Sequence, residues 1–141
     1  MIVLDTNVLS EMMRDGADPN VLAWLDRLPA SEIFTTAISI AELRFGIEAL
    51  PDGGRKTALR ARFDAVVDEE LAARILAFDA GAAEVYGVLA ASLRRSGQPI
   101  GIADAMIAAI AHREAAPVAT RNVRHFDMTG VEIINPFAAL G

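Results

Sequence analysis

The amino-acid sequence predicts an α/β fold in which a parallel sheet is covered by helices on both faces. Short runs of β-branched and other apolar residues alternate with alanine-rich stretches that favour helix. Parallel strands need crossover connections, and these are right-handed almost without exception, so the alternation favours a parallel sheet between two helical layers. The chain has 141 residues, which suits one hydrophobic core, and we therefore expect a single domain over residues 1–141.

Five short apolar runs supply the predicted strands, each typical of a strand buried on both faces. They are Ile2–Leu4, Ile33–Ala37, Ile75–Phe78, Val118–Thr120 and Val131–Ile134. Capping residues mark helix boundaries: Asp18-Pro19 begins one helix, and Asp79 begins a long one that stops before Gly97. The predicted helices are Val8–Arg14, Asn20–Arg27, Ser39–Leu50, Arg55–Val67, Asp79–Arg95 and Ile102–Glu114.

Composition restricts the function classes. The chain has 13 Lys+Arg against 19 Asp+Glu, a net charge of −6, which argues against a protein whose main role is to coat nucleic acid. It has no cysteine and only two histidines, so any bound metal should be held by oxygen ligands. No apolar run reaches the ~18 residues of a membrane span, and the N-terminus is unlike a signal peptide. We therefore expect a cytoplasmic protein without a membrane partner.

Three carboxylates occupy positions where a buried chain rarely carries charge. Asp5 directly follows the first strand, although an N-cap role is an ordinary alternative. Glu42 lies soon after the second strand, where Ser39 to Glu42 also matches a capping box. Asp104 is the only polar side chain in an alanine-rich, apolar stretch of helix, so burial would be costly without a partner. Stabilisation by the helix macrodipole is the alternative explanation there.

Topology is the reason to consider these carboxylates together. The carboxyl ends of parallel strands meet at one edge of the sheet, where ligands bind. Asp5 and Glu42 follow strands, and Asp104 begins a helix that precedes one. Clustered carboxylates raise one another's pKa unless a cation is present, and hard divalent ions prefer oxygen, so we expect Mg²⁺ or Mn²⁺. A site of this kind catalyses phosphoryl-transfer hydrolysis.

Polar residues also follow the fourth strand, in the segment Thr120–Asp127. The segment offers hydroxyl, amide, guanidinium and carboxylate groups at the same edge of the sheet. Taken singly, Arg124 and His125 are more typical of a solvated loop.

Four segments, spread from Met1 to about Phe137, carry a family resemblance. They are Ile2–Asn7, Thr36–Gly46, Ile102–Ala109 and Ala119–Asn122, with Phe126 and Asn135-Pro136-Phe137 beyond. In order and spacing they resemble PIN-domain ribonucleases, and more narrowly toxins of the VapC type in the FitB-like branch. The resemblance implies an α/β/α sandwich with a mostly parallel five-stranded sheet. It also implies a Mg²⁺- or Mn²⁺-dependent endoribonuclease that acts as the toxin of a toxin–antitoxin pair.

By this resemblance Asp5, Glu42 and Asp104 match the family's three acidic metal-binding positions, and they are the predicted metal ligands and catalytic residues. Many members have a fourth acid where this chain has Asn122. Asn122 is therefore expected in the catalytic site as a residue that orients water or a bridging hydrogen bond. Asp127, five residues further on, is the alternative replacement for the fourth acid.

Two threonines are expected to support the carboxylates. Thr6 follows Asp5, and Thr120 ends the fourth predicted strand. Hydroxyl groups in such places commonly hold metal-binding carboxylates in position.

The resemblance also implies partners. These are an RNA substrate and a cognate antitoxin, a small DNA-binding protein that inserts a segment into the toxin's groove. The alanine-rich helix Asp79–Arg95 offers a flat apolar surface, from which we predict a homodimer and a possible larger toxin–antitoxin assembly. The alternative is that this surface packs only within the fold.

Other functions fit the sequence less well. A phosphate-receiver domain would need an acidic pair near the first strand and a lysine after the last, but Lys56 lies in the wrong half. A phosphoaspartyl hydrolase would need an acid at Asn7. Glycine-rich nucleotide-binding motifs are absent from the sequence. The serious rival is a catalytically silent PIN-like module that acts by binding a protein partner.

Overall fold

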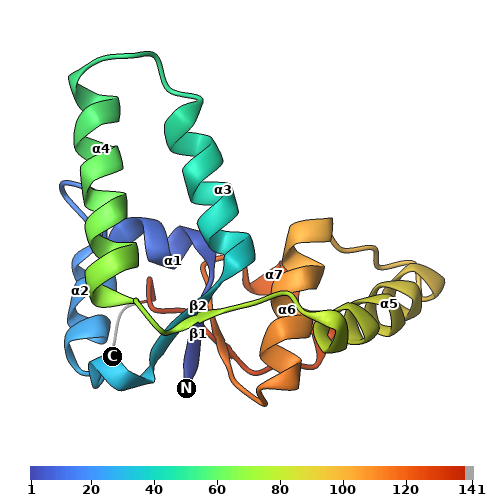
Figure 1. Ribbon diagram of the computed structural model, residues 1–141. Helices are drawn as coiled ribbons and strands as arrows, with labels where there is room; N and C mark the ends of the chain where they lie inside the picture. Colours follow the sequence, from blue (N-terminus) through green and yellow to red (C-terminus); the bar gives the residue numbers. More distant parts are fainter. Residues whose placement is uncertain (139–141) are drawn as a thin grey trace.

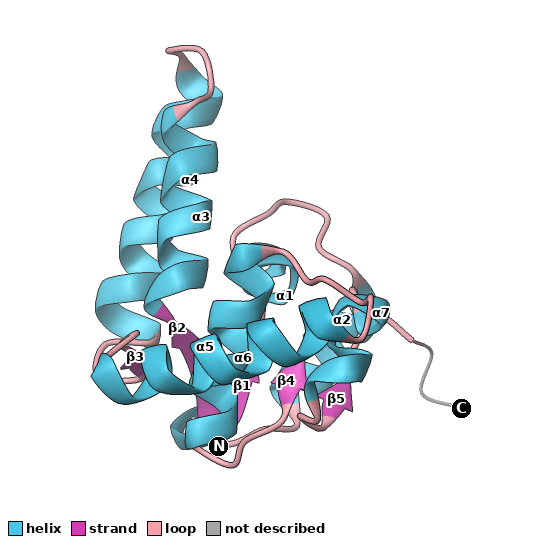
Figure 2. Ribbon diagram, turned by 90° about the vertical axis from the view of Figure 1, so that its right-hand side faces the viewer, coloured by secondary structure: helices cyan, strands magenta, loops and turns pink. Residues whose placement is uncertain are grey.

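The computed structural model describes residues 1–138 and shows a parallel sheet between two layers of helices (Figures 1 and 2). All four strand pairings are parallel, in the order β3-β2-β1-β4-β5. The strands are β1 (Ile2–Leu4), β2 (Ile33–Thr36), β3 (Ile75–Leu76), β4 (Val118–Ala119) and β5 (Ile133–Ile134). The predicted α/β class and the five-stranded sheet are confirmed.

Seven α-helices lie in the described part of the chain. They are α1 (Thr6–Glu11), α2 (Pro19–Asp26), α3 (Ala37–Glu48), α4 (Gly54–Ala65), α5 (Ala80–Arg95), α6 (Ile102–Arg113) and α7 (Val123–Phe126). Short turns of other helical types cover Ala30–Glu32, Val66–Glu70 and Asp127–Thr129. No helix of residues 1–138 combines the length and the apolar character that crossing a membrane requires.

Alternation along β1 divides the core between the two faces of the sheet. Leu4 belongs to a core shared with α1, α2 and the α3–α4 pair, and Phe63 is its buried aromatic residue. Val3 belongs to the opposite core, which contains Ile107 of α6 and Phe126 of α7. Side chains of successive strand residues point to opposite faces, so a three-residue strand is enough to anchor both helical layers.

The start of α3 differs from the prediction. The helix begins at Ala37, and the Thr36 side chain caps it by accepting from the Ser39 backbone N–H at 3.1 Å. Ser39 is therefore inside the helix and fully buried. The β-branched side chain of Thr36 favours the strand, and Thr36 is indeed its last residue. The same residue also caps the helix that follows. The predicted capping box of Ser39 and Glu42 is wrong.

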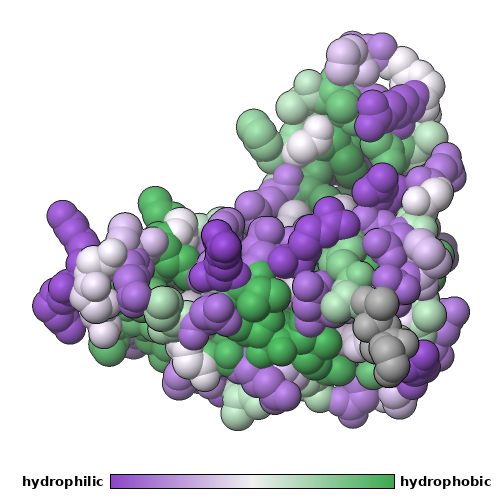
Figure 3. Space-filling model, turned by 180° about the vertical axis from the view of Figure 1, so that it is seen from behind, coloured by the Kyte–Doolittle hydropathy of each residue, from purple (hydrophilic) through white to green (hydrophobic). Residues whose placement is uncertain are grey.

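Helices α3 and α4 form a hairpin that stands clear of the sheet (Figure 1), and Figure 3 shows it rising above the rest of the surface. The break Pro51–Gly53 separates the two helices, and Gly53 has φ 154°, a conformation that favours glycine. Arg60 of α4 holds Glu48 of α3 through two hydrogen bonds of 3.1 and 2.9 Å. The α3–α4 hairpin therefore forms a wall that projects from the rest of the molecule.

Helix α5 packs against α6 on the far side of the sheet from α1 (Figure 1). Asp79 caps α5 as predicted, accepting from the Ala82 backbone N–H at 2.9 Å. It also pairs with Arg113 at the end of α6 at 2.7 Å. The capping bond and the Arg113 guanidinium together hold the pKa of Asp79 below its usual range. The same contacts tie the start of α5 to the end of α6.

Candidate active site

Side chains from four separate parts of the chain line a cleft of about 240 Å³ at the carboxyl edge of the sheet. The residues that line it are Asp5, Thr6, Asn7, Ser10, Glu42, Leu43, Asp104 and Asn122. All four predicted site residues are in this set. The parallel strand order brings them there, since β1, β2 and β4 are adjacent and end on the same side.

Asp5 is the deepest of the acids, with 2% of its surface exposed. It is the N-cap residue of α1 and accepts from the Thr6 backbone N–H at 2.8 Å. Its second oxygen accepts from Thr120 Oγ1 at 2.7 Å and from Asn7 Nδ2 at 3.3 Å. The N-cap alternative is thus correct, but it does not exclude a site role, because the same carboxylate also faces the cleft.

Burial raises the pKa of Asp5, and the nearby negative charges of Asp104 and Glu42 raise it further. The hydrogen bonds from Thr120 and Thr6 oppose this rise without cancelling it. The folded chain therefore holds Asp5 in a place where a negative charge is costly. A cation in the cleft would offset that cost.

Glu42 approaches the cleft from the second turn of α3. Because α3 begins at Ala37, Glu42 lies too far along the helix to close a capping box. Its Oε1 instead accepts from Thr6 Oγ1 at 2.7 Å, and Thr6 Oγ1 lies 3.0 Å from Ser39 Oγ. Glu42 therefore has no role in capping α3. Its carboxylate lines the cleft instead.

Asp104 lies in the first turn of α6, with 21% of its side chain exposed. Its Oδ2 is 2.8 Å from Nδ1 of His125 in α7. This partner was not among the expectations from sequence. His125 is solvent-exposed, as expected, but it lies in the short helix α7 instead of a loop and contacts Asp104. The contact depends on how α6 and α7 pack together. The one sequence signal for it is the position of His125, three residues after Asn122.

The segment after β4 reaches the cleft through Asn122, but Asp127 does not line it. The Asn122 side chain is exposed at the cleft, while its backbone N–H donates to Thr120 Oγ1 at 2.9 Å. Thr120 is fully buried, as a residue that holds Asp5 in place should be. The predicted supporting contacts of Thr6 and Thr120 are both present.

Asn7 lines the cleft but is not among the predicted site residues. Its side-chain amide donates to Asp5, and its Oδ1 accepts from the Arg121 backbone N–H at 3.1 Å. It therefore connects the segment after β1 to the segment after β4. The sequence signal for it is its place two residues after Asp5, at the start of a helix that Asp5 caps.

The donor set suits a hard divalent cation. Three carboxylates, two amides and two hydroxyl groups surround the cleft, all with oxygen atoms for ligands. Within residues 1–138, no three acidic or histidine side chains already have the spacing that would enclose an ion. The cleft thus presents converging carboxylates rather than a closed cage, and the exposed Glu42 is the one with most freedom to adjust.

The fold and the cleft define the class as an α/β domain with a cluster of acids at the carboxyl edge of a parallel sheet. The model of the PIN domain family matches residues 2–131, and the chain belongs to this family.

Similar proteins agree with the family. The chain is 44% identical over 137 residues to the VapC ribonuclease Y4jK of Sinorhizobium fredii, covering 97% of this chain and 98% of the relative. It is 38% identical over 137 residues to the toxin FitB of Neisseria gonorrhoeae, covering 97% and 99%. A solved structure of FitAB bound to a DNA fragment superimposes with a TM-score of 0.92 at 36% identity, covering 100% of this chain and 99% of that one.

Proposed function

We propose that the chain is a metal-dependent endoribonuclease that acts as the toxin of a toxin–antitoxin pair. The observation that carries the proposal is the convergence of Asp5, Glu42 and Asp104 from three elements on one cleft at the carboxyl edge of the sheet. The names of the two relatives, a VapC ribonuclease and the toxin FitB, support the same activity. The proposed cofactor is Mg²⁺ or Mn²⁺, held by these three carboxylates.

When bound there, such an ion supplies a Lewis acid that polarises a phosphate and lowers the pKa of a water molecule. The chain's own residues do the rest. Asp5 is held rigidly by Thr6 and Thr120, so its cleft-facing position needs no rearrangement. Asn122 presents a neutral amide at the mouth of the cleft, where it can hydrogen-bond water or a phosphate oxygen without adding negative charge.

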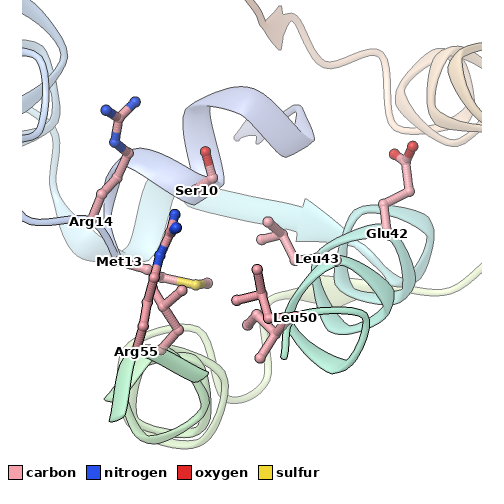
Figure 4. A pocket seen from close by; sticks show the side chains of 10 residues that line it. Ser10, Met13, Arg14, Glu42, Leu43, Leu50 and Arg55 are labelled. Atoms are coloured by element: carbon pink, nitrogen blue, oxygen red, sulfur yellow. The ribbon is translucent and has the colours of Figure 1, made fainter. Parts of the chain in front are cut away.

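The proposed antitoxin site is a groove of about 340 Å³ between α1, α3 and α4 (Figure 4). Its apolar lining comes from Met13, Leu43, Ile47, Leu50 and Leu59. Arg14 and Arg55 lie at one end and Glu42 at the other (Figure 4). A partner segment with apolar anchors and acidic neighbours suits this lining. Because Glu42 also lines the cleft, a bound segment would cover part of the active site.

Incubation of the purified protein with RNA and Mg²⁺ or Mn²⁺ tests the proposal. We expect cleavage by the wild type that EDTA abolishes and that Asp104→Asn reduces at least about 100-fold, the scale on which removal of one charge-stabilising group acts. Asp127→Asn is the matched control, since Asp127 is an exposed aspartate outside the cleft, and it should cleave as the wild type does.

Equal cleavage by the wild type and Asp104→Asn would indicate a contaminating nuclease. The neutral Asn122 at the cleft favours one second candidate, a silent module that acts only by binding its partner. A folded protein that binds the antitoxin but cleaves no RNA with either metal would support that candidate and remove the nuclease proposal.

A further inference from the structure

The three acids of the cleft are held in very different ways. Asp5 accepts hydrogen bonds from a backbone N–H, a hydroxyl and an amide, and Glu42 accepts from the Thr6 hydroxyl. For Asp104, the side-chain partner recorded among residues 1–138 is Nδ1 of His125, at 2.8 Å. Orientation of the Asp104 carboxylate therefore depends on His125.

We infer that His125 is a positioning residue that fixes the Asp104 carboxylate for cation binding, an inference that rests on the proposed function. A carboxylate only accepts hydrogen bonds, so the imidazole must carry a proton on Nδ1. The bond occupies Oδ2 of Asp104 and leaves Oδ1 for the cleft. Partners of this kind restrict the rotation of ligating carboxylates, and their loss typically weakens metal binding.

The chain segment after β4 makes this arrangement specific. Thr120 holds Asp5, and His125, five residues further on, holds Asp104. The spacing between them is set by the Asn122 N–H bond to Thr120 and by Phe126, which is fully buried in the core behind the sheet. The segment after β4 thus positions two of the three acids through hydrogen bonds. It does so at the place where the family resemblance implies a fourth acid in many members.

The contact is one of orientation, not of core stability. The His125 side chain is 57% exposed and borders a second hollow of about 380 Å³ that Asp104 also lines. Removing an exposed ring from such a place changes folding stability little. A loss of metal affinity without a loss of thermal stability would therefore separate positioning from a structural role.

Three substitutions of His125 divide the possibilities. His125→Asn places an amide nitrogen where Nδ1 stands, and His125→Gln places one nearer to Nε2. His125→Phe keeps the ring and removes both nitrogens. The matched control is His112→Phe, because His112 is the only other histidine and lies exposed at the opposite end of α6.

Mn²⁺ affinity measured by electron paramagnetic resonance of the free ion is the main readout, since it does not require nuclease activity. We expect His125→Phe and His125→Gln to bind Mn²⁺ about 10–100-fold more weakly than the wild type, with unchanged melting temperatures. His125→Asn should recover most of the affinity, and His112→Phe should equal the wild type. In the ¹⁵N spectrum of the wild type, Nδ1 of His125 should carry a proton.

Wild-type affinity in His125→Phe, or a bare Nδ1, would overturn the inference. So would equal weakening in the Phe and Asn variants, because it would show that ring shape and not the hydrogen bond matters. If the wild type itself binds no Mn²⁺, the metal site of the proposed function fails, and the inference fails with it. That result is distinguishable, since no variant would then differ from the wild type.

Discussion

Asp5 is the acid of the cleft whose pKa is raised by burial and by neighbouring negative charges. Its pKa is raised above the usual 3.8, first by desolvation and then by Asp104 and Glu42. In the metal-free protein, the stability that Asp5 contributes is complete below about pH 3.8 and is lost as the pH rises through its higher folded-state pKa. A bound cation reverses this loss because it favours the charged carboxylate.

This sign predicts how metal binding depends on pH. Below its folded-state pKa, Asp5 holds a proton that a cation must displace, so Mn²⁺ affinity should rise with pH by at most about tenfold per unit and then level off. Melting temperatures with and without Mn²⁺, measured upward from acid pH to pH 8, should show a shift that grows with pH and then levels off. A shift that is the same at every pH, or one that survives in Asp104→Asn, would contradict the prediction.

At the scale of elements, the start of α3 decides the role of Glu42. The observed cap, Thr36, lies three residues before the predicted cap, Ser39, and this shift moves Glu42 from a capping position to the second turn, next to Thr6 and the cleft. The same helix carries Leu43, Gly46 and Ile47 along the apolar groove. The hairpin therefore connects the catalytic edge to the proposed antitoxin site through consecutive turns of one helix.

Gly46 allows the groove to be filled without disturbing the fold. A Cβ at Gly46 meets nothing within 4 Å, and replacing glycine inside a helix stabilises it by about 1 kcal/mol. We expect Gly46→Leu to unfold at higher urea concentration but to bind the antitoxin about 10–100-fold more weakly, because overpacking a groove costs about 1–3 kcal/mol.

Gly46→Ala is the control, since it gains the helix propensity without filling the groove. Calorimetric titration with the antitoxin gives the affinities. If the leucine and alanine variants bind equally well, the antitoxin docks elsewhere.

At the scale of the whole molecule, charge and topology act together. Three of the acids that contribute to the net charge of −6 converge on one cleft. We expect their negative charges to oppose RNA binding until a cation is present. Exposed Arg121 and Arg124 lie in the segment that borders the cleft. We therefore expect RNA binding that is weak without metal and sensitive to salt.

The outer face of α5 carries the remaining prediction, a homodimer. The helix packs on α6, but Val88 keeps 72% of its surface exposed. Light scattering should give about twice the 15.0 kDa of the chain, and Val88→Glu should reduce the mass to one chain by placing a charge in the interface. Leu22→Glu, at an exposed leucine of α2, is the control and should leave the mass unchanged. A single-chain mass for the wild type would contradict the dimer.

Much of the fold could be predicted because local patterns carry it. Each of the five strands was expected at its place, and the Asp18-Pro19 and Asp79 caps begin α2 and α5. Boundaries were less certain where one residue suits two elements. Thr36 is a good strand residue and a good cap, and in the structure it serves as both.

The sequence by itself determined the α/β class, the five strands, and the acids that follow two strands or begin a helix, because apolar periodicity and the charged residues that interrupt it are local properties of the chain. Thr6 and Thr120 were expected to support the carboxylates, but only the tertiary structure decided which side chain holds which acid. The partners of Asp5 and Asp104, Thr120 and His125, lie 115 and 21 residues away along the chain. A hydrogen bond needs atoms within about 3 Å. The pairing of β4 with β1 brings Thr120 to Asp5, and the packing of α7 against α6 brings His125 to Asp104.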